Sequence, residues 1–182
     1  MTLGEGKRRV LMLLDEYSID GVQTVDADLD ARMNDFFDLA QRDAAAWQPI
    51  VRRVSLALDG TGSQDLPPDV ARVIRMRKQG AQAVGCEVVD GKLLYAPGDT
   101  SVLTLDYIAA PQKLGPDTPD DYEFEVSEEA AACLPYFVAA QQLVADLVVD
   151  YGAFYNLYLQ TRALLPRSTL SGGAVRQSLD GR

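Results

Sequence analysis

The chain carries helical patterns at both ends and strand patterns between them. In residues 26–49, and again in residues 127–165, apolar side chains recur every three or four positions, which is the period of an amphipathic helix. From Ile50 the period changes to two, as in strands that are buried on one face. Because amphipathic helices must bury their apolar faces, the two ends are predicted to pack into one bundle, with the strands as an inserted lobe.

The first helical part contains two predicted helices. The shorter one covers Thr2 to Glu16 and places its leucines opposite a basic side formed by Lys7, Arg8 and Arg9. The longer one begins at Asp26 or Asp28, either of which can cap it, and Pro49 ends it. Its apolar positions make the clearest periodic pattern in the chain, at Leu29, Met33, Phe36, Phe37, Ala40, Ala44 and Trp47.

The strand block opens with an alternation of apolar and other side chains over residues 53–58. In residues 74–77, Ile74 and Met76 alternate with arginines. Asp90-Gly91 predicts a hairpin with a type I′ turn, because both turn positions need positive φ angles. With a last strand over residues 102–108, the block holds about five strands, enough for a small antiparallel sheet or sandwich.

The second helical part follows a proline-rich linker over residues 111–121. Ser127 is a suitable N-cap, followed by two glutamates in the first turn. Pro135 either opens a second helical piece or kinks the first. Gly152 is predicted to mark a bend between two helices, and Pro166 ends the helical pattern.

The last residues, 166–182, cannot bury enough apolar surface to offset the entropy of ordering them. We therefore expect this tail to gain its shape by lying against a different polypeptide. The prediction is an α+β fold with a helical bundle from residues 1–49 and 116–165, an inserted β lobe of residues 50–115, and an extended docking tail.

The charge is acidic and unevenly distributed. The 182 residues carry 17 Lys and Arg against 27 Asp and Glu, a net charge of −10, and residues 116–150 contain no base at all. Such a body does not attract a nucleic-acid backbone, whose binding relies on Lys and Arg. The apolar stretches are shorter than the roughly 18 residues of a membrane-spanning helix, and the first ten residues lack the apolar core of a signal peptide.

The sequence offers little catalytic chemistry. It has no histidine, and its two cysteines, Cys86 and Cys133, are far apart and are expected to be buried free thiols. The acids at 26, 28 and 30 lack the glycine and closing glutamate of a calcium loop. Residues 4–7 lack the preceding strand and the first glycine of a phosphate loop. The acidic pairs at 120–121 and 128–129 are explained as solvated charges or as charges at a helix N-terminus. No catalytic residue, cofactor or metal is predicted.

Three tyrosines, Tyr151, Tyr155 and Tyr158, line one side of the last predicted helix. Such a stripe can stack on the bases of single-stranded nucleic acid. With only Arg162 nearby and an acidic stretch before it, packing against another helix or subunit is the favoured interpretation.

The order of segments resembles the head–tail adaptor (connector or head-completion) proteins of tailed bacteriophages. The similar pieces are the first helix, residues 1–18, the strand start Leu66-Pro67-Pro68-Asp69-Val70, the strand Leu105-Asp106-Tyr107-Ile108-Ala109-Ala110-Pro111, and the helix that starts Leu134-Pro135-Tyr136-Phe137-Val138-Ala139-Ala140 and continues to Tyr158. Together they span most of residues 1–165.

The resemblance implies a structural virion protein at the neck, assembled in the host bacterial cytoplasm. Identical subunits, commonly twelve, would form a ring that binds the portal protein, extends the DNA channel and meets the next tail component, a stopper, nozzle or tail terminator. DNA would pass without sequence-specific binding.

In such families a C-terminal segment often docks onto the portal. Here the basic and apolar residues of the tail are the predicted anchors: Arg167, Leu170, Val175, Arg176 and Leu179. Two other hypotheses remain, a small binding module whose β lobe holds a ligand or peptide, and an enzyme that uses carboxylates alone.

Overall fold

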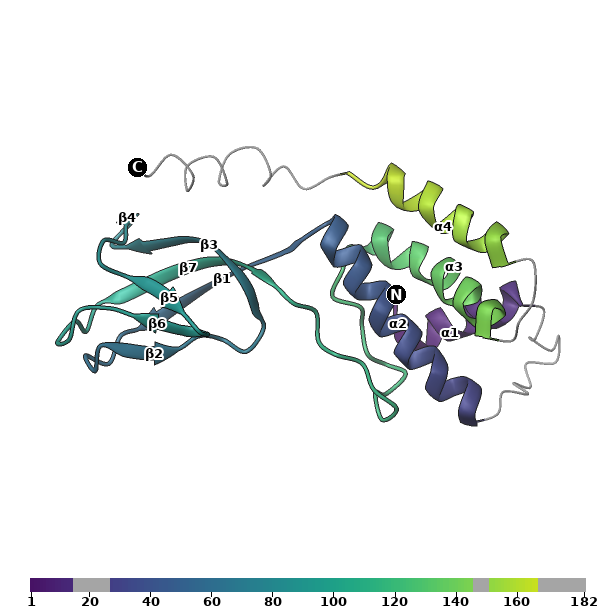
Figure 1. Cartoon of the computed structure of the whole chain (residues 1–182), viewed down its shortest axis with the longest axis horizontal. Helices are drawn as coiled ribbons and strands as arrows, with labels where there is room; N and C mark the ends of the chain where they lie inside the picture. Colours follow the sequence, from purple (N-terminus) through teal and green to yellow (C-terminus); the bar gives the residue numbers. More distant parts are fainter. Residues whose placement is uncertain (15–26, 146–150, 167–182) are drawn as a thin grey trace. The chain divides into compact units, whose positions relative to one another are not determined.

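The computed structural model describes residues 1–14, 27–145 and 151–166, without the side chains of residues 27–29, 31 and 145 (Figure 1). These residues form an α+β protein of two compact units. The helical unit comprises residues 1–48 and 111–166, and the strand unit comprises Pro49–Ala110. The predicted fold, a bundle built from both ends of the chain with an inserted antiparallel lobe, is confirmed.

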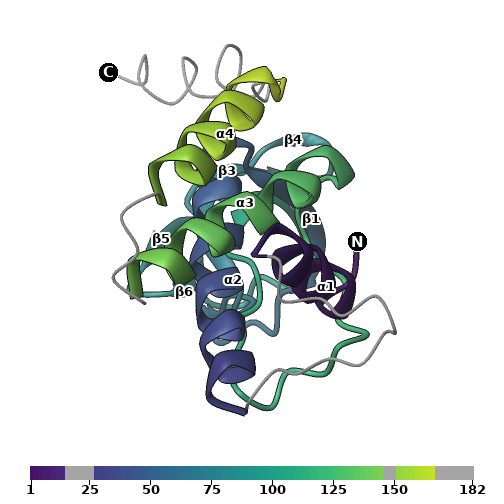
Figure 2. The same cartoon turned by 90° about the vertical axis from the view of Figure 1, so that its right-hand side faces the viewer.

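The helical unit is centred on α3, which contacts each of the other three helices (Figure 2). Its core side of small and aliphatic residues includes Ala131, Leu134 and Val138, all buried. The Ser127 hydroxyl accepts a hydrogen bond from the Ala130 N–H at 3.2 Å, which confirms the predicted N-cap. Pro135 lies inside one continuous helix rather than opening a second. The helices are α1 (Leu3–Leu13), α2 (Ala27–Trp47), α3 (Glu128–Ala145) and α4 (Tyr151–Leu164).

The start of α1 is fixed by a capping box and a close helix contact. Thr2 and Glu5 each accept a hydrogen bond from the other's backbone N–H, at 3.2 and 2.9 Å. Gly6 is buried, and a Cβ atom added there would lie 2.8 Å from the ring of Phe37 in α2. The glycine in this short helix therefore permits close packing of α1 on α2.

We expect Gly6→Ala to destabilise the helical unit by about 1 kcal/mol. Overpacking a tight core costs about 1–3 kcal/mol, and the better helix propensity of alanine returns about 1 kcal/mol. The matched control is Gly152→Ala in α4, where an added Cβ meets nothing within 4 Å, so stability should rise. Chemical denaturation followed by the fluorescence of the single tryptophan, Trp47, measures both. Equal effects of the two changes would contradict the packing role of Gly6.

The strand unit contains two antiparallel sheets, ordered β1-β7-β3-β4 and β2-β6-β5. Leu93 of one sheet and Leu103 of the other lie in the same buried cluster with Leu58 and Tyr95, which makes the lobe a small sandwich. Asp90 and Gly91 have φ angles of 49° and 77°, so the predicted hairpin turn is confirmed. The strands are β1 (Ile50–Ala57), β2 (Ser63–Asp65), β3 (Val70–Lys78), β4 (Ala81–Gln82), β5 (Glu87–Val89), β6 (Lys92–Leu94) and β7 (Val102–Ala109).

Two details differ from the sequence predictions. The lobe ends at Ala110 and not at residue 115, because Leu114 is fully buried and its N–H donates to Asp38 of α2 at 2.9 Å. Of the two free cysteines, Cys133 is buried as expected, whereas Cys86 is only half-buried against the core of the sandwich.

Loop carboxylates make the strand unit sensitive to acid. Hydrogen bonds from Thr61 and Tyr95 lower the pKa of Asp59 to about 2. Hydrogen bonds from Lys78 and Ser101 likewise lower the pKa of Asp99 to about 2. Because both values lie below the ordinary value of 3.8, the stability they contribute is complete above pH 4 and is lost as the pH falls from about 4 to about 2.

We therefore expect carboxyl carbon NMR shifts of Asp59 and Asp99 to titrate with midpoints near pH 2. Asp59→Asn should flatten the loss of strand-unit stability between pH 4 and pH 2, measured by amide exchange. Midpoints near pH 4 for both carboxylates would show that these hydrogen bonds do not hold in solution.

Candidate interaction surfaces

Helix α4 is apolar on most sides but is scarcely buried. Of its fourteen residues only Tyr158 is fully buried, while Leu164 is 84% exposed and Tyr151 47% exposed. A helix that is apolar around its circumference is normally enclosed by other protein. Its exposed apolar side chains are Tyr151 and Tyr155, on the same side as Tyr158, and Leu157 and Leu164 on the other side; exposed apolar groups of this kind mark contacts between proteins.

The inner side of α4 is anchored to α2 through Asp43. The Tyr158 hydroxyl and the Arg162 guanidinium both donate to the Asp43 carboxylate, and the guanidinium lies 5.0 Å from the centre of the Trp47 ring. Burial and the Asp43 charge raise the pKa of Tyr158 far above its usual value, so it remains a hydrogen-bond donor. This cluster fixes which side of α4 faces outward.

The predicted tyrosine stripe lies on one side of α4, and the burial of its members decreases from Tyr158 to Tyr151. Tyr158 packs within the helical unit, with its ring centre 5.2 Å from that of Phe137 in α3. Tyr155 also lies near Phe137, at 6.5 Å, but is 38% exposed. Tyr151 is exposed. Packing between helices therefore involves Tyr158 and part of Tyr155, and the rest of the stripe is left open.

The strand unit carries a basic surface on the outward side of its larger sheet. In the register of β1, β7 and β3, Arg53 of β1 and Arg75 of β3 both lie opposite Asp106 of β7, and Arg77 lies opposite Thr104 of the same strand. Arg53 Nε is 2.5 Å and Arg77 Nη2 3.7 Å from the Asp106 carboxylate. The hydrogen bond from Arg53, with the charges of Arg77 and Arg75, lowers the pKa of Asp106.

We call this surface the arginine face and define it as Arg53, Arg72, Arg75 and Arg77 around Asp106, with Val51 and Ile74 beside them. The face contains a hollow of about 270 Å³, which is lined by Val51, Arg52, Arg53, Ile74, Arg75, Arg77 and Asp106. One carboxylate against several guanidiniums leaves the face positively charged. Arginines among exposed aliphatic side chains are typical of protein interfaces.

The opposite charge collects on the segment that returns from the strand unit to α3. Asp117, Asp121, Glu123, Glu128 and Glu129 are exposed, and within the described part of the chain none of these five forms an ion pair. We call residues 115–129, which carry these five side chains, the acidic segment.

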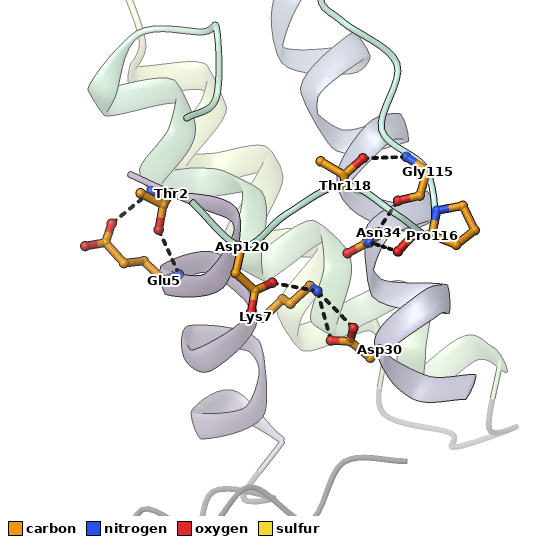
Figure 3. Close-up of polar contacts among 9 residues, drawn as sticks. All are labelled: Thr2, Glu5, Lys7, Asp30, Asn34, Gly115, Pro116, Thr118 and Asp120. Carbon is orange, nitrogen blue, oxygen red and sulfur yellow. Dashed lines mark hydrogen bonds and ion pairs between the residues drawn. The ribbon is translucent and has the colours of Figure 1, made fainter. Parts of the chain in front are cut away.

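A polar network holds the acidic segment against α1 and α2 (Figure 3). The buried Lys7 ammonium lies 2.9 Å from Asp30 in α2 and 2.9 Å from Asp120. Asn34 donates to the carbonyl oxygens of Gly115 and Pro116 at 2.9 and 3.3 Å. The prediction that Lys7 lies opposite the apolar side of the first helix is therefore wrong, because Lys7 is buried and two carboxylates compensate its charge.

This network also accounts for several acids singled out in the sequence. Asp30 and Asp120 pair with Lys7, and the two glutamates at 128–129 occupy the first turn of α3. Within residues 1–14, 27–145 and 151–166 no group of three or more His, Cys, Asp or Glu is placed to hold a metal ion. No helix among the described residues is long and apolar enough to cross a membrane.

Two sets of predicted positions fall outside the described residues. The first set is the predicted portal anchors, Arg167, Leu170, Val175, Arg176 and Leu179. The second is the predicted caps of the longer helix, since Asp26 and the side chain of Asp28 are not described.

The arginine face was missed by the sequence analysis. Its signal was present, because arginines occupy the polar positions of two alternating strands. A β-bulge between Val73 and Arg75 also turns Ile74 toward the arginines rather than into the core, and periodicity alone cannot show this.

A scan against protein-family models finds no match for this chain, and a search among curated proteins finds no significant match either.

Proposed function

We propose that the protein is a structural subunit of a tailed-phage virion, a head–tail adaptor that assembles into a ring between the portal and the tail. The observation that carries this proposal is α4, an apolar helix with one fully buried residue among fourteen. Such a helix needs a second protein surface to cover it, and identical neighbours in a closed ring supply one to every copy.

The fold supports the same function. The order of helices and strands, from which the resemblance to adaptor proteins was drawn, is also the order of elements in the fold. The net charge of −10 suits a conduit for DNA, since like charge lets the duplex pass without adhering. The portal would bind residues 166–182, and the next tail component would bind the far side of the ring.

The test is the mass of the assembly, alone and with the portal protein of the same phage. Light scattering and negative-stain microscopy of the full chain with the portal should show a ring stacked on the portal. Truncation after Leu165 should abolish portal binding and leave the bundle folded. A chain that stays monomeric in both preparations would contradict the ring, and a truncated chain that binds the portal with full affinity would contradict tail docking.

A second candidate function rests on the hollow in the arginine face. Its arginines suit an anionic ligand or an acidic peptide, which fits a small binding module. Isothermal titration with acidic peptides separates the two functions: a binding module is a monomer that binds such a peptide at a single site, whereas the adaptor is a ring.

A further inference from the structure

The arginine face and the acidic segment lie on different units and have opposite signs. The arginine face belongs to the strand unit, and the acidic segment belongs to the helical unit. We propose that the arginine face of one copy binds the acidic segment of the next copy, which makes a head-to-tail contact between subunits. This inference rests on the proposed ring, and it assigns the surfaces through which neighbours recognise each other.

The arginine face has positive charge that the strand unit does not neutralise. Asp106 is largely buried, with 14% of its side chain exposed, and it is engaged by Arg53. A second guanidinium, that of Arg77, lies 3.7 Å from the Asp106 carboxylate. Arg72 is exposed at the edge of the face. An incoming carboxylate can therefore bind guanidinium groups without displacing the pair between Arg53 and Asp106.

The acidic segment is held in place before any partner arrives. Lys7 and Asn34 fix its first half, and Gln41 of α2 accepts a hydrogen bond from the Glu125 N–H at 2.9 Å. A segment that is already ordered loses little conformational entropy on binding, so its exposed carboxylates remain available for a partner at small cost.

A second copy is the occupant favoured by this arrangement. Each chain carries both the arginine face and the acidic segment, so every copy can bind one neighbour through its face and another through its segment. A contact between two different surfaces is heterologous, and repetition of such a contact closes into a ring when the rotation permits. A duplex or an unrelated basic partner would use only one of the two surfaces.

The test is charge reversal on each surface, separately and in combination. Arg72→Glu/Arg75→Glu leaves the pair between Arg53 and Asp106 intact, and Asp117→Lys/Glu123→Lys changes the other surface. Each double variant alone should raise the dissociation constant between subunits at least about tenfold, as clustered like charges do at interfaces. An equimolar mixture of the two, or both changes in one chain, should restore association. Sedimentation velocity in low salt measures this.

The matched control for Arg72→Glu/Arg75→Glu is Arg9→Glu/Lys92→Glu, which makes the same change in net charge at exposed positions outside both surfaces. It should leave association unchanged.

A second measurement does not depend on loss of assembly: Arg75→Lys permits zero-length carboxyl–amine cross-linking in a mixture of ¹⁴N- and ¹⁵N-labelled chains. Mixed-isotope peptides that join residue 75 to residues 117–129 are expected.

The outcomes distinguish the two proposals. Rings of unchanged affinity in both charge-reversal variants would overturn this contact and leave the adaptor function standing. A wild-type chain that is monomeric with and without the portal would overturn both. Cross-links confined to single-isotope peptides would show that the surfaces pair within one chain, which also overturns the contact between copies.

Discussion

Phe37→Ala is expected to lower the free energy of unfolding of the helical unit by about 3–5 kcal/mol, the usual cost of removing a fully buried phenylalanine. The Phe37 side chain is 0% exposed. Its ring lies against Gly6 of α1, and its centre is 5.3 Å from that of Phe124, just before α3. The ring thus joins three parts of the chain that are distant in sequence, and its loss leaves a cavity at their meeting point.

Denaturation followed by Trp47 fluorescence measures this effect, because the only tryptophan is in α2. Leu39→Ala is the matched control on the same helix: Leu39 is 52% exposed, so its removal should change stability by no more than about 0.5 kcal/mol. Similar costs at positions 37 and 39 would mean that the contact of α2 with α1 and Phe124 does not stabilise the bundle.

Much of this core was predictable from the sequence. Met33, Phe37, Ala40 and Ala44 are buried, as the three-to-four periodicity of residues 26–49 predicted. The cap at Ser127 and the turn at Asp90-Gly91 were also correct, since both depend on local chemistry. Periodicity and capping act over a few residues, and the sequence contains that information directly.

The interaction surfaces were less predictable because they depend on contacts between distant parts of the chain. Lys7 was predicted to lie opposite the apolar side of its helix, but Asp120, more than a hundred positions away, supplies a partner that allows its burial. The arginine face needs the register of β1, β7 and β3 and the bulge before Arg75. The exposure of α4 follows from tertiary packing alone, because its apolar sequence resembles that of a buried helix.

Asp43→Ala is expected to destabilise the docking of α4 by about 2–3 kcal/mol. Hydrogen bonds to a charged group contribute about 1.5–3 kcal/mol each, and the partly exposed Arg162 bond lies at or below the low end because solvent screens it. Without the carboxylate, the buried Tyr158 hydroxyl loses its acceptor. Because Arg162 lies over the Trp47 ring, release of α4 should also shift the tryptophan emission of the native protein.

A double-mutant cycle assigns the effect. Tyr158→Phe removes the hydroxyl and keeps the ring against Phe137, so Asp43→Ala should cost less in that background than in the wild type. Asp35→Ala changes an exposed carboxylate of the same helix and should leave stability and emission unaltered. In the proposed ring, the anchor at Asp43 sets which side of α4 meets the neighbouring copy, so Asp43→Ala should weaken subunit association more than its stability loss alone accounts for. Full assembly of Asp43→Ala, with native tryptophan emission, would show that the outer side of α4 does not depend on this anchor.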